Sequence, residues 1–427
     1  MGFAQGVSAL SASAANLDVI GNNIANSGTI GFKSGSVQFA DVYAGSRVGL
    51  GTQVAGVAQN FTSGAVQSST RALDVAITNG DGFFRLASPG GEIAYSRNGQ
   101  FNVDKNGFLV NAAGLQLTGF PVSATGAIAG GSPTALQFPT SGMAPKPTDA
   151  IAAQFNLDSR SKLLPTTGPA FDAKDPATYS YSNAVNIFDS LGNSHELATF
   201  FRKTATTLAP ASSEWEMYAT ADGQPLAAGG AIDTGTPPVA GTIGTVPFDS
   251  NGILDTAAAT YPAGGKLNFS GLDFSNGSSS MTFDMNITGT TQFGNENQVN
   301  KLTQTGYTSG VLTSYAIGQD GTVTGKYSNE QSNPLGQIVL SSFINPNGLQ
   351  LKGDNVWAET SASGQPLTGK PGSGTKLGAL TAGALEGSNV DLTSELVNLI
   401  IAQRTYQANS QTVKTQDQVM QTLINMR

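Results

Sequence analysis

The stretch 391–427, DLTSELVNLIIAQRTYQANSQTVKTQDQVMQTLINMR, decides how this chain is organised. It contains no Gly or Pro, so it predicts one long helix that begins near Asp391 and spans about 55 Å at a rise of ~1.5 Å per residue. Apolar residues recur every seven positions, with two more between them; these are Leu392, Leu399, Tyr406, Val413 and Met420, then Leu396 and Ile424. The other slots of that second row are polar. A heptad pattern of this kind seeks a partner helix.

A matching stripe lies at the other end of the chain. Apolar or small residues step by four and three along the series Phe3, Val7, Leu10, Ala14, Leu17, Gly21 and Ile24. Residues 1–32 contain a single charged side chain, whereas a helix with water on its far side normally carries Lys and Glu there. We therefore predict a terminal helical coiled-coil pair that becomes ordered only when it packs among other copies.

Composition excludes several classes of function. Only 12% of the 427 residues are charged, against roughly 25% in an ordinary protein. The net charge of −8 is thinly spread, and no basic stripe is present to neutralise phosphates, which argues against nucleic-acid binding. Because the chain has no Cys, it forms neither disulfides nor thiolate metal sites.

Targeting signals are also missing from the sequence. A secretory signal needs a basic start and an apolar run, but the first charged residue is Asp18 and the first Lys is Lys33. No window approaches 18 consecutive apolar residues, so we expect no transmembrane helix. These features fit a cytoplasmic protein, or one exported by a route that reads an unprocessed N-terminus.

Between the two stripes the sequence predicts a mainly β protein with nested antiparallel domains. Residues 71–147 and 291–365 form an inner β domain, and residues 148–290 form an outer β domain inserted within it. The flanking parts are the linkers 33–70 and 366–379 and the terminal helical domain 1–32 with 380–427. Pro-, Gly- and Thr-rich stretches mark the boundaries.

Short turn signals predict individual hairpins. The run 79–82 (NGDG) leads from an alternating strand at 73–77 into the strand 83–86, and the run 104–107 (DKNG) separates two further strands. In the outer domain, the run 189–193 (DSLGN) separates strands at 185–188 and 197–200.

A search for catalytic groups finds none, so no enzyme activity, cofactor or metal site is predicted. A nucleophile–His–acid triad would have to use His195, the single histidine, which we expect to face solvent beside its hairpin turn. Asp104–Gly107 and Asp249–Gly252 lack the spaced acidic ligands of a calcium loop and are read as turns. An acidic pair for glycan hydrolysis cannot be placed.

Three segments carry a family resemblance. The run 15–26 (ANLDVIGNNIAN), continued by 29–33 (TIGFK), closely resembles the N-terminal motif of the bacterial flagellar rod and hook protein family. The run 95–101 (YSRNGQF) resembles the core domain of that family, and 387–391 (GSNVD) with 403–409 (QRTYQAN) resembles its C-terminal signature. The last ten residues and the central insert look more like hook than rod proteins.

The resemblance implies a structural subunit of the flagellar hook. Such a subunit self-assembles into a flexible helical tube, a universal joint that transmits torque from rod to filament, with both helix stripes in the assembly interface. It further implies contacts with a rod protein, a hook cap protein, a hook–filament junction protein and the flagellar export apparatus. The location would be extracellular, on the basal body, after export without a cleaved signal peptide.

Other functions stay open at this point. One alternative is a distal rod subunit of the flagellar basal body. Another is a surface carbohydrate-binding or adhesive β protein, which would suit uncharged Ser/Thr/Gly-rich domains but leaves the terminal stripes unexplained.

Overall fold

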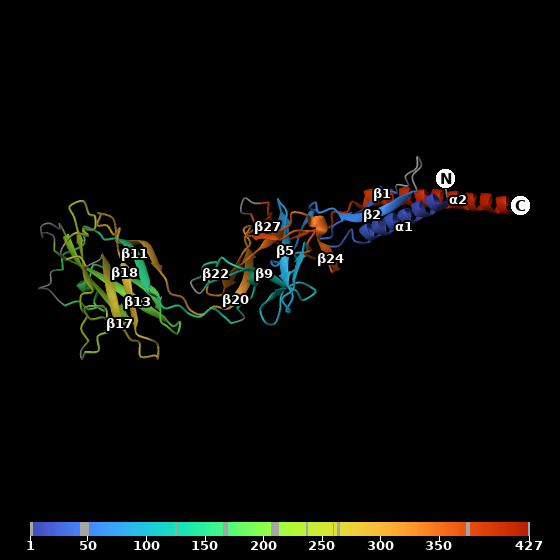
Figure 1. Cartoon of the computed structure of the whole chain (residues 1–427). Helices are drawn as coiled ribbons and strands as arrows, with labels where there is room; N and C mark the ends of the chain where they lie inside the picture. The colour runs from blue at the N-terminus through green and yellow to red at the C-terminus, as the bar shows by residue number, and fades with distance from the viewer. Residues whose placement is uncertain are drawn as a thin grey trace. The chain divides into compact units, whose positions relative to one another are not determined.

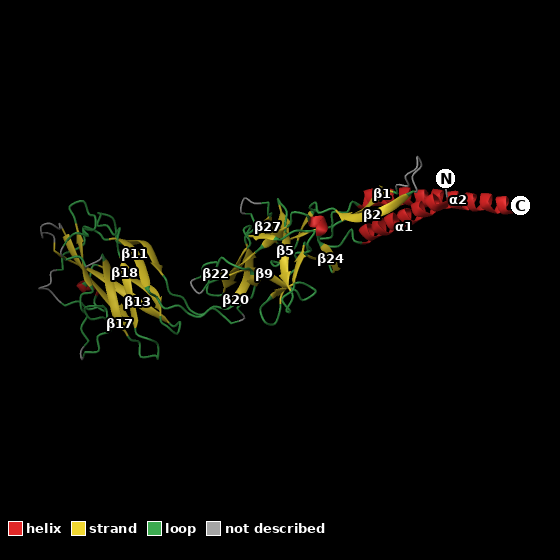
Figure 2. Ribbon diagram, in the orientation of Figure 1, coloured by secondary structure: helices red, strands yellow, loops and turns green. Residues whose placement is uncertain are grey.

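The structure is a computed structural model that describes residues 3–42, 51–123, 126–139, 141–164, 170–205, 213–235, 238–258, 260–262, 265–372 and 376–425. The chain divides into two compact units (Figures 1 and 2). The first contains residues 1–140, 313–326 and 330–427, and the second contains residues 141–312 and 327–329. The chain therefore leaves the first unit after residue 140, builds almost all of the second unit and returns at residue 313, and residues 327–329, at the end of β21 (Thr322–Tyr327) and in the turn after it, also belong to the second unit.

The first unit contains the two terminal helices, α1 (Phe3–Ala25) and α2 (Leu392–Asn425), which lie side by side (Figure 1). As predicted, α2 begins after Asp391, whose carboxylate accepts a hydrogen bond from the Thr393 amide at 2.9 Å and another from the Ser394 hydroxyl at 3.1 Å. The Ser394 amide also donates to this carboxylate, at 3.3 Å. The amides of Thr393 and Ser394 have no partner within the helix, so these contacts satisfy them and fix the helix start. Arg427, expected at the helix end, lies outside the described residues.

A β-hairpin follows α1, in the segment that the sequence analysis treated as a linker. Strands β1 (Gly35–Asp41) and β2 (Thr52–Gln59) are antiparallel from the pair Gly35↔Gln59 to the pair Asp41↔Thr52. Both strands contact α1. The two strands are therefore held by packing on the helix as well as by their own pairing.

The rest of the first unit is built on a network of 13 strands, with the main order β20-β21-β22-β9-β5-β6-β25-β24. Its strands are β5 (Phe83–Ala87), β6 (Ile93–Ser96), β7 (Asn102–Val103), β8 (Leu109–Val110), β9 (Gln116–Pro121), β10 (Thr134–Ala135), β20 (Leu312–Ile317), β21 (Thr322–Tyr327), β22 (Ser332–Ile338), β23 (Leu340–Ser342), β24 (Gln350–Gly353), β25 (Val356–Ala358) and β26 (Leu367–Gly369). Strands from before and after the second unit thus share one sheet, for example β9 beside β22.

Two small strand pairs connect this network to the start of α2. They are β3 (Val66–Ser68) with β28 (Ala384–Glu386), and β4 (Val75–Thr78) with β27 (Ala379–Ala382). The expected hairpin across 79–82 is wrong, because β4 pairs with β27 instead of β5. Asn79 does adopt the positive φ of a turn, but Val75, Ala76 and Ile77 are all buried, so their partner was chosen by tertiary packing.

The second unit is a sandwich of two sheets. One sheet has the order β17-β18-β11-β19, and the other has the order β12-β13-β14-β15 with β16 beside β14. The strands are β11 (Ala150–Asn156), β12 (Tyr181–Phe188), β13 (Ser194–Ala205), β14 (Ser213–Ala221), β15 (Gln224–Pro225), β16 (Gly244–Phe248), β17 (Lys266–Leu272), β18 (Met281–Asn286) and β19 (Gln298–Gln304). Side chains of both sheets share one core that includes Trp215 and Phe269, each fully buried.

The sandwich extends further than the predicted outer domain. Strand β19 was placed in the inner domain by sequence, but it belongs to the second unit because it pairs along β11, from Ile151↔Gln304 to Asn156↔Gln298. The hairpins expected at 104–107 and 189–193 are present as β7–β8 and β12–β13. Two short 3-10 helices, Pro176–Thr178 and Pro346–Gly348, complete the described elements. Among those elements, neither long helix is apolar enough to cross a membrane.

Candidate assembly interface

The terminal helices run antiparallel, and three contacts fix their register. An added Cβ on Gly6 would lie 2.7 Å from Cγ2 of Val413, so the backbone of α1 approaches α2 closely there. Asn409 donates to the Ser13 hydroxyl at 3.4 Å, and Asn23 donates to Oε1 of Glu395 at 3.1 Å. Small and polar side chains therefore form much of the seam, which permits close backbone approach but buries little apolar surface.

The covered face of α2 is offset from the predicted second row. Besides Leu399 and Val413, the less exposed positions of α2 are Glu395, Ala402, Asn409, Ser410, Thr412 and Gln416. Four of them, Glu395, Ala402, Asn409 and Gln416, recur every seven residues, three after each main heptad position. The predicted second row lies four residues after each main heptad position, so it is one residue away from this covered row. The structure therefore directs the small and polar row toward α1, because Ala and Asn allow the two backbones to come closer than Leu and Ile would.

The predicted seam residues fall into two groups. Leu10, Leu17, Ile24, Leu399 and Val413 are partly buried. Val7, Leu392, Leu396, Tyr406, Met420 and Ile424 are exposed, with exposed fractions between 40% for Tyr406 and 69% for Ile424. Phe3 lies in α1, but its side chain is outside the described part of the chain. The role of all twelve in contacts between copies stays a prediction.

Further apolar residues of α2 face solvent. Val397, Ile400, Ile401 and Val419 are each at least half exposed. Charged residues are few along the helix: Glu395, Arg404, Lys414 and Asp417 are the only ones between Leu392 and Asn425. A solvated helix face normally carries many charges, so this combination is typical of a helix that is covered by other protein.

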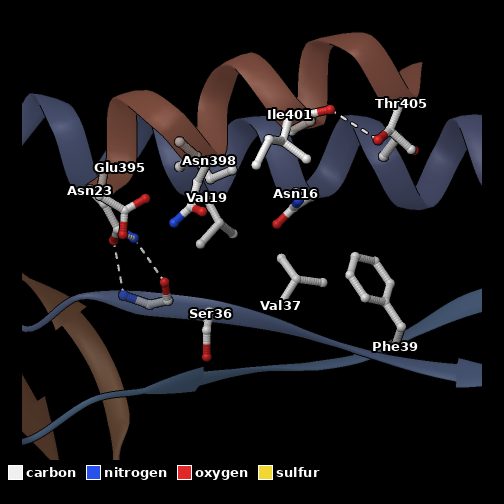
Figure 3. Close-up of a pocket in the computed structure, with 14 residues that line it drawn as sticks. Asn16, Val19, Asn23, Ser36, Val37, Phe39, Glu395, Asn398, Ile401 and Thr405 are labelled. Carbon is white, nitrogen blue, oxygen red and sulfur yellow. Dashed lines mark hydrogen bonds between the residues drawn. The ribbon is translucent and has the colours of Figure 1, made fainter. Parts of the chain in front are cut away.

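A groove separates the helix pair from the hairpin, and Figure 3 shows it in close-up. We call it the hairpin groove; its volume is about 350 Å³, and it is lined by Ser13, Asn16, Val19, Ile20, Asn23, Gly35, Ser36, Val37, Phe39, Glu395, Asn398, Ile401, Ala402 and Thr405. Asn23 closes one end: its amide nitrogen donates to the Gly35 carbonyl at 2.8 Å, and its amide oxygen accepts from the Gly35 N–H at 2.9 Å. Asn23 therefore joins α1, β1 and α2.

The base of the helix pair is held by a buried ionic cluster of Lys33, Arg97 and Glu386. The ammonium of Lys33 lies 2.6 Å from one carboxylate oxygen of Glu386, and the guanidinium of Arg97 lies 3.2 Å from the other. All three side chains are almost fully buried. The cluster connects the segment after α1, the end of β6 and the end of β28, so it fixes both helix ends to the inner sheet.

Neutralisation within this cluster is incomplete, because it contains two cations and one carboxylate. Burial lowers the pKa of Lys33, and the neighbouring Glu386 opposes that shift only in part. Nε of Arg97 is buried without a hydrogen-bond partner among the described residues, although the guanidinium lies over the Phe83 ring at 5.2 Å. Groups buried in this way are costly to separate, so the cluster is a rigid anchor.

The family-like sequence motifs build this anchor. Gly31 adopts a φ of +71°, and a Cβ there would lie 2.7 Å from the carbonyl carbon of Arg97, so only glycine fits. Asn389 donates to the Asn60 carbonyl at 2.8 Å and accepts from the Ser34 amide at 2.8 Å. Sequence reasoning missed this site; the signal available was Lys33, the first cation of the chain, inside an otherwise uncharged motif.

The single histidine differs from expectation. His195 is only 8% exposed, so the prediction that it faces solvent is wrong. Its ring stacks on Phe274, Nδ1 lies 2.6 Å from Asp222, and Nε2 lies 3.3 Å from Asp189. The β17–β18 loop covers the turn and buries the ring. These contacts join three turns of the sandwich.

The two segments considered as calcium loops contain turns held by their own Asp side chains. Asp104 and Asp249 each accept hydrogen bonds from two backbone amides of their own turn, so both segments are turns as predicted. Among the residues that the structure describes, no group of three or more His, Cys, Asp or Glu side chains could hold a metal ion.

Known protein families match this chain in four separate segments. Four family models match: "Flagella basal body rod protein" over residues 5–33, "Flagellar hook protein FlgE/F/G D1 domain" over 76–148, "Flagellar basal body protein FlaE D2 domain" over 156–307, and "Flagellar basal body rod FlgEFG protein C-terminal" over 381–426. A mainly β chain with a terminal helix pair and these four matches is a flagellar protein of the rod and hook class.

Relatives that match over their full length show which family of the rod and hook class the chain belongs to. The chain is 47% identical to the flagellar hook protein FlgE of Escherichia coli strain K12 and 46% identical to that of Salmonella typhimurium, over all of both chains. It is 31% identical to that of Borreliella burgdorferi, over 99% of this chain and 98% of the relative. The chain belongs to the flagellar hook protein family and is a structural subunit of the hook, not a member of an enzyme class.

A solved structure supports the fold. The crystal structure of the Helicobacter pylori flagellar hook protein FlgE2 superposes with a TM-score of 0.51, covering 75% of this chain and all of that one at 14% identity. At this identity the similarity concerns the fold alone, and it agrees with the mainly β architecture described above.

Proposed function

We propose that this subunit polymerises through its helical end into a flexible tube, the hook, and that the tube transmits torque from rod to filament. The observation that carries this proposal is the uncovered apolar surface of α2, from Leu396 and Ile400 to Met420 and Ile424. A polymer that grows indefinitely needs heterologous contacts, in which one face of a copy binds a different face of the next. The seam residues named above are the proposed contact residues.

The two units suit different parts of such a tube. Apolar helix contacts resist separation because they gain about 1.5–3 kcal/mol for each large side chain that becomes fully buried. The second unit is rich in Ser, Thr and Gly, so we propose that its outer contacts are largely polar and hydrated and slide as the tube bends. The nested domain division predicted from sequence is part of this proposal.

The proposal extends to partners and location. A polymer of this kind needs a rod protein at its base, a cap protein at its growing end and a junction protein toward the filament. We further propose that the flagellar export apparatus delivers the chain outside the cell without cleavage of a signal peptide. Support for these steps comes from membership of the flagellar hook protein family.

The test is assembly of the purified chain, observed by electron microscopy at high protein concentration. We expect tubes from the intact chain and none from a variant that lacks residues 400–427, because that variant loses most of α2. Its sheets should stay folded, as measured by far-UV circular dichroism. Normal tubes from the truncated chain would contradict the proposal.

Point variants make the test sharper. Leu399→Asp and Met420→Asp place a charge on the predicted heptad row of α2 and should also abolish tubes. Gln224→Asp adds the same charge at an exposed position of β15 in the second unit and should leave assembly intact. Equal loss of assembly in all three variants would show that added charge, not the helix seam, is responsible.

A further inference from the structure

The two terminal helices differ in length, and α2 projects past α1. Because Gly6 of α1 lies against Val413, residues 417–425 of α2 extend beyond the first turn of α1. We call residues 417–425 the overhang. Its side chains Val419, Met420 and Ile424 are 50%, 52% and 69% exposed. Met420 continues the heptad row of Leu399 and Val413. The apolar row of α2 therefore extends beyond the end of α1.

The hairpin groove lies toward the opposite end of the helix pair, beside the first turns of α2. Val37 and Phe39 reach toward the helices from β1, and Ile401 reaches toward the hairpin from α2 (Figure 3). Phe39 is 49% exposed and Ile401 is 57% exposed, so neither finds enough cover within the chain. At about 30 Å³ per water molecule, a volume of about 350 Å³ corresponds to on the order of ten waters, which apolar side chains could replace.

The hairpin groove and the overhang have complementary side chains, since both are apolar with uncharged neighbours. The groove combines Val37, Phe39 and Ile401 with small uncharged side chains such as Ser36 and Asn398, and its carboxylate, Glu395, already accepts a hydrogen bond from Asn23. The overhang combines its three exposed apolar residues with Gln418, Gln421 and Thr422, and its carboxylate, Asp417, accepts a hydrogen bond from Gln421. Neither surface brings an unpaired buried charge to the contact, so desolvation would cost little.

We propose that the overhang of one copy binds in the hairpin groove of a second copy. The inference rests on the proposed function, because it gives the polymer one of its heterologous contacts. Overhang and groove lie at opposite ends of the same helix pair, so each bound copy leaves one groove and one overhang free. Such a heterologous contact can repeat from copy to copy, as an open polymer requires, and it covers apolar side chains of both the hairpin and the helix end.

Disulfide trapping tests this contact cleanly, because the natural chain contains no Cys. Met420→Cys and Val37→Cys are made in separate chains, mixed, assembled and oxidised. A disulfide requires Cβ atoms about 3.5–4.5 Å apart, so only a close contact is trapped. We expect covalent dimers from the mixture and none from either variant alone. A chain that carries both substitutions should give a ladder of multimers.

Three outcomes of the cross-linking experiment would contradict the proposed contact, and they can be told apart. Dimers from Met420→Cys alone would mean that two overhangs bind each other, and would overturn the proposal. Tubes without cross-links in the mixture would overturn it while leaving the proposed function intact. Failure of the intact chain to form tubes would overturn the proposed function and this inference together. Gln350→Cys, on the exposed strand β24, replaces Val37→Cys as the negative control.

A second pair and a second measurement guard against variants that fail to assemble. Ile424→Cys with Ile401→Cys should trap the same contact from the other apolar positions. Phe39→Ser should raise the critical concentration for assembly by roughly tenfold, since about half of a Phe side chain loses its partner surface. Phe39→Leu keeps an apolar side chain and should stay within a few-fold of the natural chain. An unchanged critical concentration in Phe39→Ser would contradict the proposal.

Discussion

The second unit and the helical end of the first unit treat apolar side chains in opposite ways. In the second unit, two sheets enclose Leu267, Phe269 and Trp215 so fully that none of the three is exposed. Along α2, Ile400 and Ile401 are about half exposed. A buried side chain of this size contributes about 1.5–3 kcal/mol. The second unit gains that free energy by folding, whereas the exposed side chains of α2 can gain it only by binding.

The ionic cluster at the base of the helices explains how a helix pair with an exposed apolar surface stays attached to a folded sheet. A helix pair with few apolar contacts would fray from its attachment to the inner sheet unless something else held it. Glu386 provides that attachment by accepting from Lys33, Arg97 and the Gly64 amide. The anchor uses polar groups inside the protein, so it leaves the apolar helix surface free for assembly.

The largest expected effect is at this anchor. Glu386→Ala leaves two buried cations without their carboxylate, and removal of one partner from a buried pair costs about 3–5 kcal/mol. We expect the free energy of unfolding of the first unit to fall by this amount in urea titrations, with the second unit unchanged. Glu92→Ala removes an exposed carboxylate from the same unit and should change stability by less than about 0.5 kcal/mol. A similar effect from both variants would contradict the role of the cluster.

A matched pair of Leu→Ala substitutions tests the comparison itself. Leu267 is fully buried and Leu396 is 45% exposed. Leu267→Ala should lower the free energy of unfolding of the second unit by about 2–5 kcal/mol. Leu396→Ala should change the stability of the monomer by less than about 0.5 kcal/mol and yet weaken tube formation. If Leu396→Ala destabilised the monomer as strongly as Leu267→Ala, the helical end would have a core of its own.

Acid should act on the second unit through a buried carboxylate. Burial alone would raise the pKa of Asp189, but hydrogen bonds from Asn193 and Asn276 outweigh it and hold the pKa well below its usual range. A lowered pKa in the folded state stabilises the unit above the ordinary Asp value of about 3.9, and this contribution is lost as the pH falls toward the folded pKa.

The corresponding experiment measures the urea midpoint of the second unit between pH 6 and pH 2. The natural chain should lose stability below about pH 4 more steeply than Asp189→Asn, which has no carboxylate to titrate at that position. Asp273→Asn changes an exposed carboxylate and should keep the slope of the natural chain. Equal slopes for the natural chain and Asp189→Asn would show that this carboxylate does not govern acid stability.

The smallest expected effect is at the start of α2. Hydrogen bonds from Ser394 and Thr393 lower the pKa of Asp391, and they hold the first turn of the helix. Asp391→Ala should speed amide hydrogen exchange in that turn without changing the second unit, because it removes the acceptor at the cap. Asp391→Asn keeps a side-chain oxygen there and should exchange more slowly than Asp391→Ala. Uniform exchange rates in all three chains would mean that packing alone fixes the helix start.

Features set by near neighbours in the chain were predictable. The absence of Gly and Pro after Asp391 gave the long helix, and the turn residues of 104–107 and 189–193 gave two hairpins that the structure contains. Each depends on backbone preferences or hydrogen bonds that span a few residues, so it survives in almost any tertiary context.

Pairings between distant residues were not predictable in the same way. The partner of β4 lies about 300 residues away in β27, and the partner of Lys33 lies 353 residues away in Glu386. His195 is buried because the β17–β18 loop packs over its turn. The residues next to His195 in the sequence do not predict that packing. The offset of the α2 seam depends on which side chains let α1 approach, and that is decided by contact between the helices.

The amino-acid order alone therefore determined where the helices and several turns form, and that the ends of the chain carry apolar stripes with few charges. It determined these features because helix period, capping and turn geometry depend on residues close in sequence. Only the tertiary structure decided which strands pair, where the buried charges meet and which apolar side chains stay uncovered. Those outcomes depend on packing between segments hundreds of residues apart, where many pairings satisfy the same local pattern.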